Sequence, residues 1–198
     1  MFQLPFFRRD LPALEGQRVR LRLPGWQDYA EWAALRAESR AFLEPWEPRW
    51  APDELSRAAF RHRVRRSKHD YEQGTGISFF VFEKAEGRLA GGISLSNIRH
   101  GVAQSASIGY WMGERYAGKG LMHEALRLII PFAFEQLRLH RLEAACIPSN
   151  TRSMRLLEKA GFQREGLLRS YLRINGVWQD HHLYALIAGE HQAPPGRG

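Results

Sequence analysis

The chain has a single cysteine, no long apolar run, and fewer acidic than basic residues. Because one cysteine, Cys146, cannot form an internal disulfide, a reducing and therefore cytoplasmic location is expected. No apolar stretch approaches the length of a membrane span, so no membrane contact is expected. The histidines stand at no spacing to cysteine or acidic residues that suggests a metal site. The sequence thus argues against disulfide-stabilised, membrane-spanning and metal-dependent proteins.

The shortage of acidic residues gives the chain a formal net charge of +8, from 29 basic and 21 acidic side chains. A basic surface suits nucleic acid, a ribosome or an anionic cofactor, and it disfavours a free polycationic substrate. Part of the excess lies in a predicted helix, between Arg61 and Lys68. This run is either a solvated helix face or a surface that contacts ribosomal RNA through its phosphates.

Length and composition predict one globular domain, residues 16–190, between an irregular N-terminal arm, 1–15, and a disordered tail, 191–198. Alternating or β-branched segments predict strands at residues 18–22, 77–83, 89–97, 102–112, 141–147, 166–174 and 177–187. Helical spacing predicts helices at residues 26–40, at 53–72, after residue 120 and at 149–161. Two prolines make residues 42–48 a predicted loop, and Pro131 is expected to kink the third helix near Arg127.

The segment of residues 115–120, Arg-Tyr-Ala-Gly-Lys-Gly, joins a predicted strand to a predicted helix. The first backbone N–H groups of a helix have no internal partner, and the helix dipole places about half a positive charge there. Gly118 and Gly120 have no Cβ, so an anion can approach the backbone closely. Arg115 and Lys119 add charge. The segment therefore predicts a diphosphate site at a helix N-terminus.

A second motif follows at Asn150-x-x-Ser153-x-x-Leu156-x-x-x-Ala160-Gly161-Phe162. With Arg-x-x-Gly-x-Gly before it, the pair resembles the GCN5-related N-acetyltransferase (GNAT) family. The resemblance implies an α/β (α+β) fold with a mixed, mostly antiparallel sheet of about seven strands and about four helices. The sheet would splay between its fourth and fifth strands, and the pantetheine arm of acetyl-CoA, the cosubstrate, would lie in the gap.

The same resemblance implies which residues bind acetyl-CoA, through backbone groups of the fourth strand, the glycine-bearing loop and the second motif. The cofactor-binding residues would be Tyr110, Trp111, Met112, Arg115, Tyr116, Gly118, Lys119, Gly120, Leu121, Asn150 and Ser153.

Further motifs resemble one branch of the family, the RimJ-type ribosomal-protein-alanine N-acetyltransferases. They are Phe-Leu-Glu-Pro-Trp-Glu-Pro at residues 42–48, Ser-Asn at 96–97, Gly-Lys-Gly-Leu-Met at 118–122 and Ile-x-Gly-x-Trp-x-Asp-His at 174–181. This likeness implies acetylation of the N-terminal α-amine of a ribosomal protein, one beginning with alanine. The substrate-binding residues would be Glu44, Trp46, Asn97 and Asp180.

Direct attack of the amine on the thioester is expected, since Cys146 has no His/Asp partner pattern for a covalent relay. At pH 7, deprotonation costs about 1–1.4 kcal/mol for an α-amine and about 4.6 kcal/mol for a lysine. A modest base therefore suffices. Glu47 and Glu44 are the best candidates, with Glu47 expected to be catalytic, and Asp180, His181 or a water relay are alternatives. Ser153 would assist the leaving thiolate.

Two other functions stay open. One is acetylation of a small amine such as a polyamine or an antibiotic. The other is a ribosome- or RNA-binding factor whose coenzyme A site is vestigial. The sequence leaves open whether the chain is a monomer or a homodimer.

Overall fold

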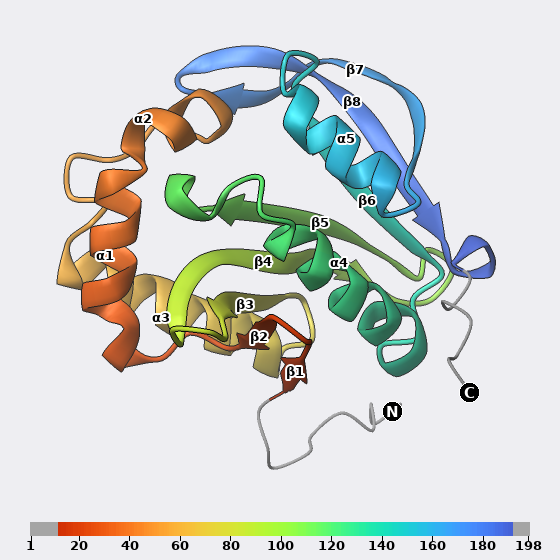
Figure 1. Cartoon of the computed structure of the whole chain (residues 1–198). Coiled ribbons are helices and arrows are strands. Elements are labelled where there is room, and N and C mark those ends of the chain that lie inside the picture. Colours follow the sequence, from red (N-terminus) through yellow and green to blue (C-terminus); the bar gives the residue numbers. More distant parts are fainter. Residues whose placement is uncertain (1–11, 192–198) are drawn as a thin grey trace.

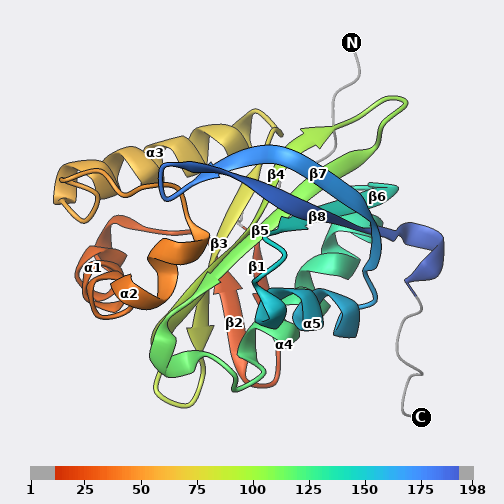
Figure 2. The ribbon, with the colours of Figure 1, turned by 90° about the horizontal axis from the view of Figure 1, so that it is seen from above.

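The computed structural model describes residues 12–191, and these form one mixed sheet with helices on both of its faces (Figures 1 and 2). The eight strands are ordered β1-β2-β3-β4-β5-β6-β8-β7 across the sheet. They are β1 (Ala13–Glu15), β2 (Val19–Arg22), β3 (Ile77–Glu83), β4 (Arg88–Arg99), β5 (Ser105–Met112), β6 (Arg141–Cys146), β7 (Gln163–Ile174) and β8 (Val177–Ile187). The α-helices are α1 (Tyr29–Glu38), α2 (Arg40–Leu43), α3 (Arg57–Glu72), α4 (Leu121–Pro131) and α5 (Thr151–Lys159). None of the helices described is long and apolar enough to cross a membrane.

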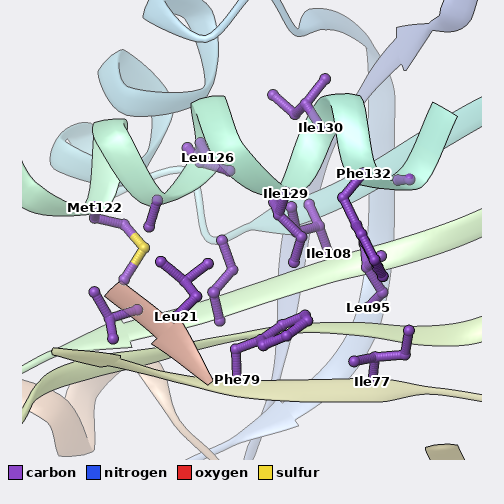
Figure 3. Packing of buried hydrophobic residues seen from close by; sticks show 14 of the residues in the cluster. Leu21, Ile77, Phe79, Leu95, Ile108, Met122, Leu126, Ile129, Ile130 and Phe132 are labelled. Atoms are coloured by element: carbon purple, nitrogen blue, oxygen red, sulfur yellow. The ribbon is translucent and has the colours of Figure 1, made fainter. Parts of the chain in front are cut away.

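Alternation along β3 gives the sheet two apolar faces. Phe79 meets Phe132, just after α4, with ring centroids 5.9 Å apart, whereas Phe80 meets Phe60 of α3 at 6.4 Å. Neighbouring residues of a strand point to opposite faces, so α4 and α3 cover opposite sides of the sheet. Figure 3 shows the α4 side, where Leu126 and the residues around it pack onto the strands.

The sheet opens between β5 and β6. Their parallel pairing covers only Ser105–Arg141, Ala106–Leu142 and Ser107–Glu143, although β5 continues to Met112 and β6 to Cys146. Beyond Ser107 the facing edges of these strands are unpaired with each other. Since β5 and β6 are the fourth and fifth predicted strands, the expected splay is confirmed.

The sheet has one strand more than expected, because Ala13–Glu15 pairs with Arg20–Arg22 as β1. The prediction of an irregular arm was therefore wrong for these residues. A strand of this length shows too little alternation to be recognised from sequence. The rest of the predicted arm, residues 1–11, and the tail from residue 192 lie outside the described residues.

The predicted helix at 26–40 is divided. A 3₁₀ turn, Trp26–Asp28, precedes α1, and Ser39 separates α1 from α2. Ser39 is fully buried, and its Oγ accepts a hydrogen bond of 2.9 Å from the backbone N–H of Glu114. A second 3₁₀ turn, Glu44–Trp46, follows, so the loop predicted at 42–48 is partly helical. Pro45 fits there because the first turn of a helix needs no N–H from it.

Two other helix boundaries differ from the sequence prediction. The helix α3 begins at Arg57, after Ser56, whose side chain accepts a hydrogen bond from Ala59 N–H and caps the helix. At Pro131 the regular part of α4 ends, and the chain continues as a π-helical turn, Phe132–Gln136. Proline cannot donate to the carbonyl four residues before it, so the expected disturbance takes the form of a wider turn.

Candidate active site

The loop before α4 is built to receive an anion. Gly118 and Gly120 both have left-handed backbones, with φ of 75° and 80°, and Gly120 is the N-cap of α4. A Cβ added at Gly118 would meet no heavy atom within 4 Å, so the space above the loop is open. The first N–H groups of α4 and its positive dipole end lie at this opening. Leu121 has its side chain in the core, so only its backbone can contribute.

The two cations of the loop are placed differently. Arg115 forms an ion pair of 3.3 Å with Glu38 of α1 and lies over the ring of Tyr116 at 4.9 Å. Tyr116 is buried and supports the loop from below. Lys119 has no carboxylate within 4 Å among residues 12–191. Lys119 is therefore the loop side chain whose charge is available to an anion.

Sequence reasoning missed Arg18, which joins the start of β2 to this loop. Its Nη1 donates to the carbonyl of Lys119 at 3.1 Å, and its Nε donates to Glu124 of α4 at 3.0 Å. Burial alone would raise the pKa of Glu124, but the hydrogen bonds from Arg18 outweigh it and lower that pKa. The partners are more than a hundred residues apart, so no local pattern signals the contact.

The open edge of β5 lies beside this loop. Tyr110, Trp111 and Met112 pair with β4 on one side, whereas the pairing with β6 on the other side has ended at Ser107. Alternate residues of such an edge present N–H and C=O groups to the gap. An extended chain rich in amides can satisfy these groups by adding itself as a strand.

Two hydroxyl groups meet across the gap. Tyr110 OH lies 2.7 Å from Ser153 Oγ of α5. Asn150 caps α5 by accepting the Ser153 N–H at 3.1 Å, and its amide nitrogen has no partner in the described residues. Burial raises the pKa of Tyr110, so its hydroxyl stays protonated at neutral pH. Burial also raises the pKa of Cys146 to about 11, which leaves its thiol neutral and a poor nucleophile.

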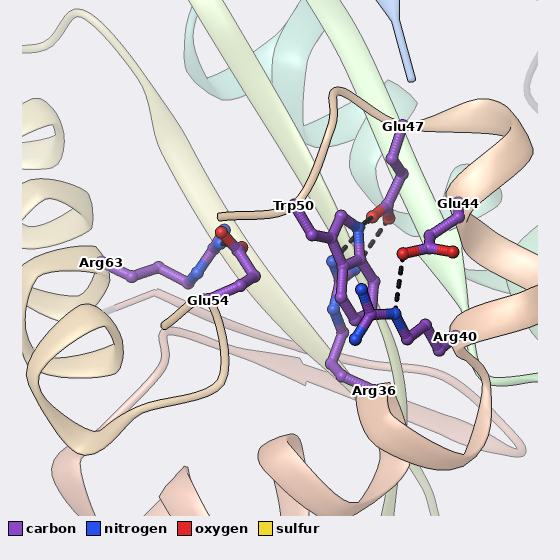
Figure 4. Close-up of polar contacts among 7 residues, drawn as sticks. All are labelled: Arg36, Arg40, Glu44, Glu47, Trp50, Glu54 and Arg63. Atoms are coloured by element: carbon purple, nitrogen blue, oxygen red, sulfur yellow. Dashed lines mark hydrogen bonds and ion pairs between the residues drawn. The ribbon is translucent and has the colours of Figure 1, made fainter. Parts of the chain in front are cut away.

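The opposite side of β5 is held by a buried guanidinium (Figure 4). Arg36, 5 % exposed, donates to both carboxylate oxygens of Glu47, at 2.7 and 2.6 Å. The indole N–H of Trp50 donates to the same carboxylate at 2.8 Å. The Arg36 guanidinium lies over the rings of Trp50 and Trp111, with its carbon 4.4 and 5.0 Å from their centroids.

This geometry bears on the candidate base. Both oxygens of Glu47 are engaged by donors, so its carboxylate orients Arg36 and Trp50 in this structure. A base role for Glu47 would require one of these hydrogen bonds to break, and it stays a prediction. Neither Arg36 nor Trp50 was identified from the sequence.

A polar cavity of about 680 Å³ opens next to this cluster. It is lined by Arg40, Glu44, Arg49, Trp50, Ala51, Pro52 and Asn175. Glu44 accepts a hydrogen bond of 2.7 Å from Arg40 through one oxygen only, which leaves its other oxygen available. The tip of the β7–β8 hairpin closes the cavity, because the Asn175 N–H donates to the Glu47 carbonyl at 2.9 Å.

The structure brings Glu44 to the cavity but not the other predicted substrate residues. Trp46 is 37 % exposed, and the wall is formed by Trp50 in its place. Asn97 donates to Ser107 Oγ at 3.4 Å, near the paired end of β5. Asp180 accepts the Ser170 N–H at 2.8 Å and holds a bulge in β7.

Comparison with known proteins identifies the family of the chain that carries this loop, gap and cavity. The pattern of the acetyltransferase (GNAT) domain matches residues 18–163. The chain belongs to the GNAT family of acetyltransferases. The acetyltransferase is 38 % identical to the probable N-acetyltransferase YjcK of Bacillus subtilis, over 88 % of this chain and 96 % of that protein.

Two further relatives cover nearly the full length of the acetyltransferase. The [ribosomal protein uS5]-alanine N-acetyltransferase of Escherichia coli is 34 % identical over 91 % of this chain and 94 % of its own. The structure of Mycobacterium smegmatis RimJ in complex with CoA-disulfide superposes with a TM-score of 0.84. It is 32 % identical, over 91 % of this chain and 88 % of that one. In residues 12–191 of the acetyltransferase, no group of three or more metal-ligating side chains gathers.

Gly120→Asp tests the anion site. A carboxylate above the loop should repel a diphosphate, and we expect coenzyme A affinity to fall at least tenfold, about 1.4 kcal/mol. Gly101→Asp is the control for the backbone conformation, since Gly101 also has a positive φ, 69°; a Cβ there would meet nothing within 4 Å, whereas one at Gly120 would lie 3.1 Å from Arg18 Nη2. Calorimetric titration with coenzyme A should show the loss for Gly120→Asp alone. Equal affinity of the two variants would contradict the site.

Glu47→Gln tests the role of the Arg36 cluster. Removing the anionic partner of a buried guanidinium should lower the free energy of unfolding by about 3 kcal/mol. Glu44→Gln, which breaks an exposed pair, should cost less than about 1 kcal/mol. Urea denaturation of both variants measures the difference. A stable Glu47→Gln protein that has lost turnover would instead identify Glu47 as the base.

Proposed function

We propose that the acetyltransferase moves the acetyl group of acetyl-CoA to the N-terminal α-amine of a ribosomal protein, with alanine as the first residue. The observation that carries the proposal is the arrangement of the open β5 edge between an anion site and a polar cavity that contains Glu44. The relative from E. coli, named for alanine acetylation of ribosomal protein uS5, supports this acceptor.

Acetyl-CoA supplies an acetyl group activated as a thioester. The open space over Gly118 and the N-terminus of α4 fit its diphosphate, and Lys119 adds a positive charge. The unpaired backbone of β5 and the amide nitrogen of Asn150 fit its pantetheine arm. RimJ of M. smegmatis, named as a complex with CoA-disulfide, supports this assignment.

The acceptor amine would enter through the cavity, where the available oxygen of Glu44 can receive it. Glu44 is the one carboxylate among the described residues that line the cavity, and it is paired with Arg40, so the cavity lining supplies no strong base. An α-amine needs only about 1–1.4 kcal/mol to lose its proton at pH 7. A lysine needs about 4.6 kcal/mol. The lack of a strong base in the cavity therefore favours an α-amine as the acceptor.

Ser153 would donate a hydrogen bond to the thiolate of coenzyme A as the C–S bond breaks and the amide C–N bond forms, while the amine releases its proton to water and the thiolate takes one up from solvent. The neutral Tyr110 hydroxyl, 2.7 Å away, can donate to Ser153 Oγ, so that the serine proton is turned toward the gap. Tyr110 is then a positioning residue in addition to its backbone contacts. The neutral Cys146 thiol leaves direct transfer to the amine as the route.

The cavity volume also favours a second candidate, acetylation of a small amine, because sites for small ligands occupy about 300–1,000 Å³. A polyamine is disfavoured, because the cavity contains two arginines and one glutamate. An uncharged or zwitterionic amine fits this lining better.

A peptide pair tests the acceptor. One peptide has a free N-terminal alanine, and the other has a blocked terminus and an internal lysine. Mass spectrometry after incubation with acetyl-CoA should show acetylation of the first, with kcat/KM at least tenfold higher, because its amine is easier to deprotonate. Preference for the blocked peptide, or for a small amine over both, would overturn the proposed acceptor.

Tyr110→Phe tests the hydroxyl pair. Losing one hydrogen bond of about 1.4 kcal/mol in the reacting state should lower kcat about tenfold and leave the KM for acetyl-CoA within about twofold. Tyr184→Phe is the control, because Tyr184 OH also bonds to α5, at Glu158, 3.0 Å away, and not to Ser153. Steady-state kinetics should separate the two. Unchanged kcat in both variants would exclude the positioning role.

A further inference from the structure

One face of α3 carries three arginines without carboxylate partners. Arg57, Arg61 and Arg65 stand at intervals of four residues, so they follow one another along one side of the helix at about 6 Å spacing. All three are exposed, and none has a carboxylate within 4 Å among residues 12–191. We refer to these three residues as the arginine stripe.

Other cations of the same helix are paired, which sets the arginine stripe apart. Arg63 binds Glu54 at 2.6 Å, Arg66 lies 3.7 Å from Asp70, and Lys68 lies 3.7 Å from Glu72. A solvated basic helix gains a few tenths of a kcal/mol from each such pair. The three arginines of the arginine stripe have no such carboxylate pairs, so they repel one another. A bound external anion would reduce this repulsion.

Aromatic rings accompany the arginine stripe. The Arg57 guanidinium lies 4.5 Å from the centroid of the Tyr29 ring, and Arg65 lies 6.0 Å from that of Trp26. Trp26 is 53 % exposed, an unusual state for so large an apolar side chain. Unpaired nucleic-acid bases stack on exposed tryptophan rings and on arginine planes, whereas the carboxylates of an acidic peptide do not stack.

The arginine stripe does not serve the acetyl-transfer site. The helix α3 packs on the Phe80 side of the sheet, and α4 with its anion loop packs on the Phe79 side (Figure 2). A ligand on the arginine stripe therefore does not compete with the cofactor. The net charge of +8 adds long-range attraction for a polyanion.

We propose that the arginine stripe and Trp26 bind single-stranded RNA, with phosphates on the arginines and a base on the indole. The surface gives the acetyltransferase a way to dock on an RNA-containing substrate while its cavity takes an amine. The proposal rests on the arginine stripe itself and stands whether or not the acceptor is a ribosomal protein.

The test uses fluorescence anisotropy of a labelled, mixed-sequence single-stranded RNA at several salt concentrations. The stripe variant, Arg57→Gln with Arg61→Gln and Arg65→Gln, should lose at least about tenfold in affinity near 0.1 M salt. Its slope of log affinity against log salt should fall in magnitude by about 2, since each phosphate contact on a single strand contributes about 0.7. Trp26→Ala should weaken RNA binding with an unchanged slope.

The control variant removes three exposed, carboxylate-paired cations outside α3, by Arg20→Gln, Arg88→Gln and Arg99→Gln. It has the same net charge as the stripe variant and should keep near wild-type affinity. Equal loss in both variants, or stronger binding of polyglutamate than of RNA by the wild type, would overturn the proposal. The stripe variant should acetylate the free-alanine peptide at the wild-type rate, which separates this test from that of the acceptor.

Discussion

The structure of the site depends on the buried guanidinium of Arg36. It sits between the indoles of Trp50, which forms a wall of the cavity, and Trp111, which belongs to the open edge of β5. A buried cation is costly unless it is paired and hydrogen-bonded, and the bidentate contact with Glu47 pairs the two Nη atoms and leaves only Nε without a partner among residues 12–191. The position of Glu47 is fixed in turn by Trp50 and by the hairpin tip at Asn175. The cavity and the open edge of β5 are thereby held in a fixed position relative to each other.

Neighbouring side chains of β5 point to opposite faces of the sheet and therefore contact different parts of the site. Trp111 turns toward Arg36 and Tyr110 turns toward Ser153, so adjacent residues supply a structural clamp on one face and a hydroxyl pair on the other. Close packing allows this only because β4 has glycine opposite. A Cβ at Gly92 would lie 2.5 Å from the Trp111 indole nitrogen. The same strand presents its unpaired backbone to the gap. One strand therefore carries the open backbone edge, the Trp111 contact with Arg36 and the Tyr110 contact with Ser153, and the helices on both faces hold it in place.

What could be predicted from the sequence was what is encoded locally. The glycines at 118 and 120 and the cap at Asn150 lie within short motifs, and the splay follows from the family that these motifs identify. Contacts between segments far apart in the sequence correspond to no local sequence pattern. Arg18 reaches Glu124, and Arg36 meets Trp50 and Trp111, through folding alone. The proline-rich motif drew attention to Glu47 but could not show that its carboxylate is already bound. Strand β1 is too short for a periodic signal, and the choice of Trp50 over Trp46 depends on how the loop packs.

The central claim is that the open edge of β5 and the N-terminus of α4 hold acetyl-CoA together. Amide hydrogen exchange, with and without saturating acetyl-CoA, tests it most directly, since it reports on these backbone groups themselves. We predict slower exchange for gap-facing amides between Tyr110 and Met112 and for the first amides of α4. Amides of α3, on the face of the sheet opposite to α4, should keep their rates. Protection at α4 without any change at residues 110–112, or no protection at either place, would contradict the account.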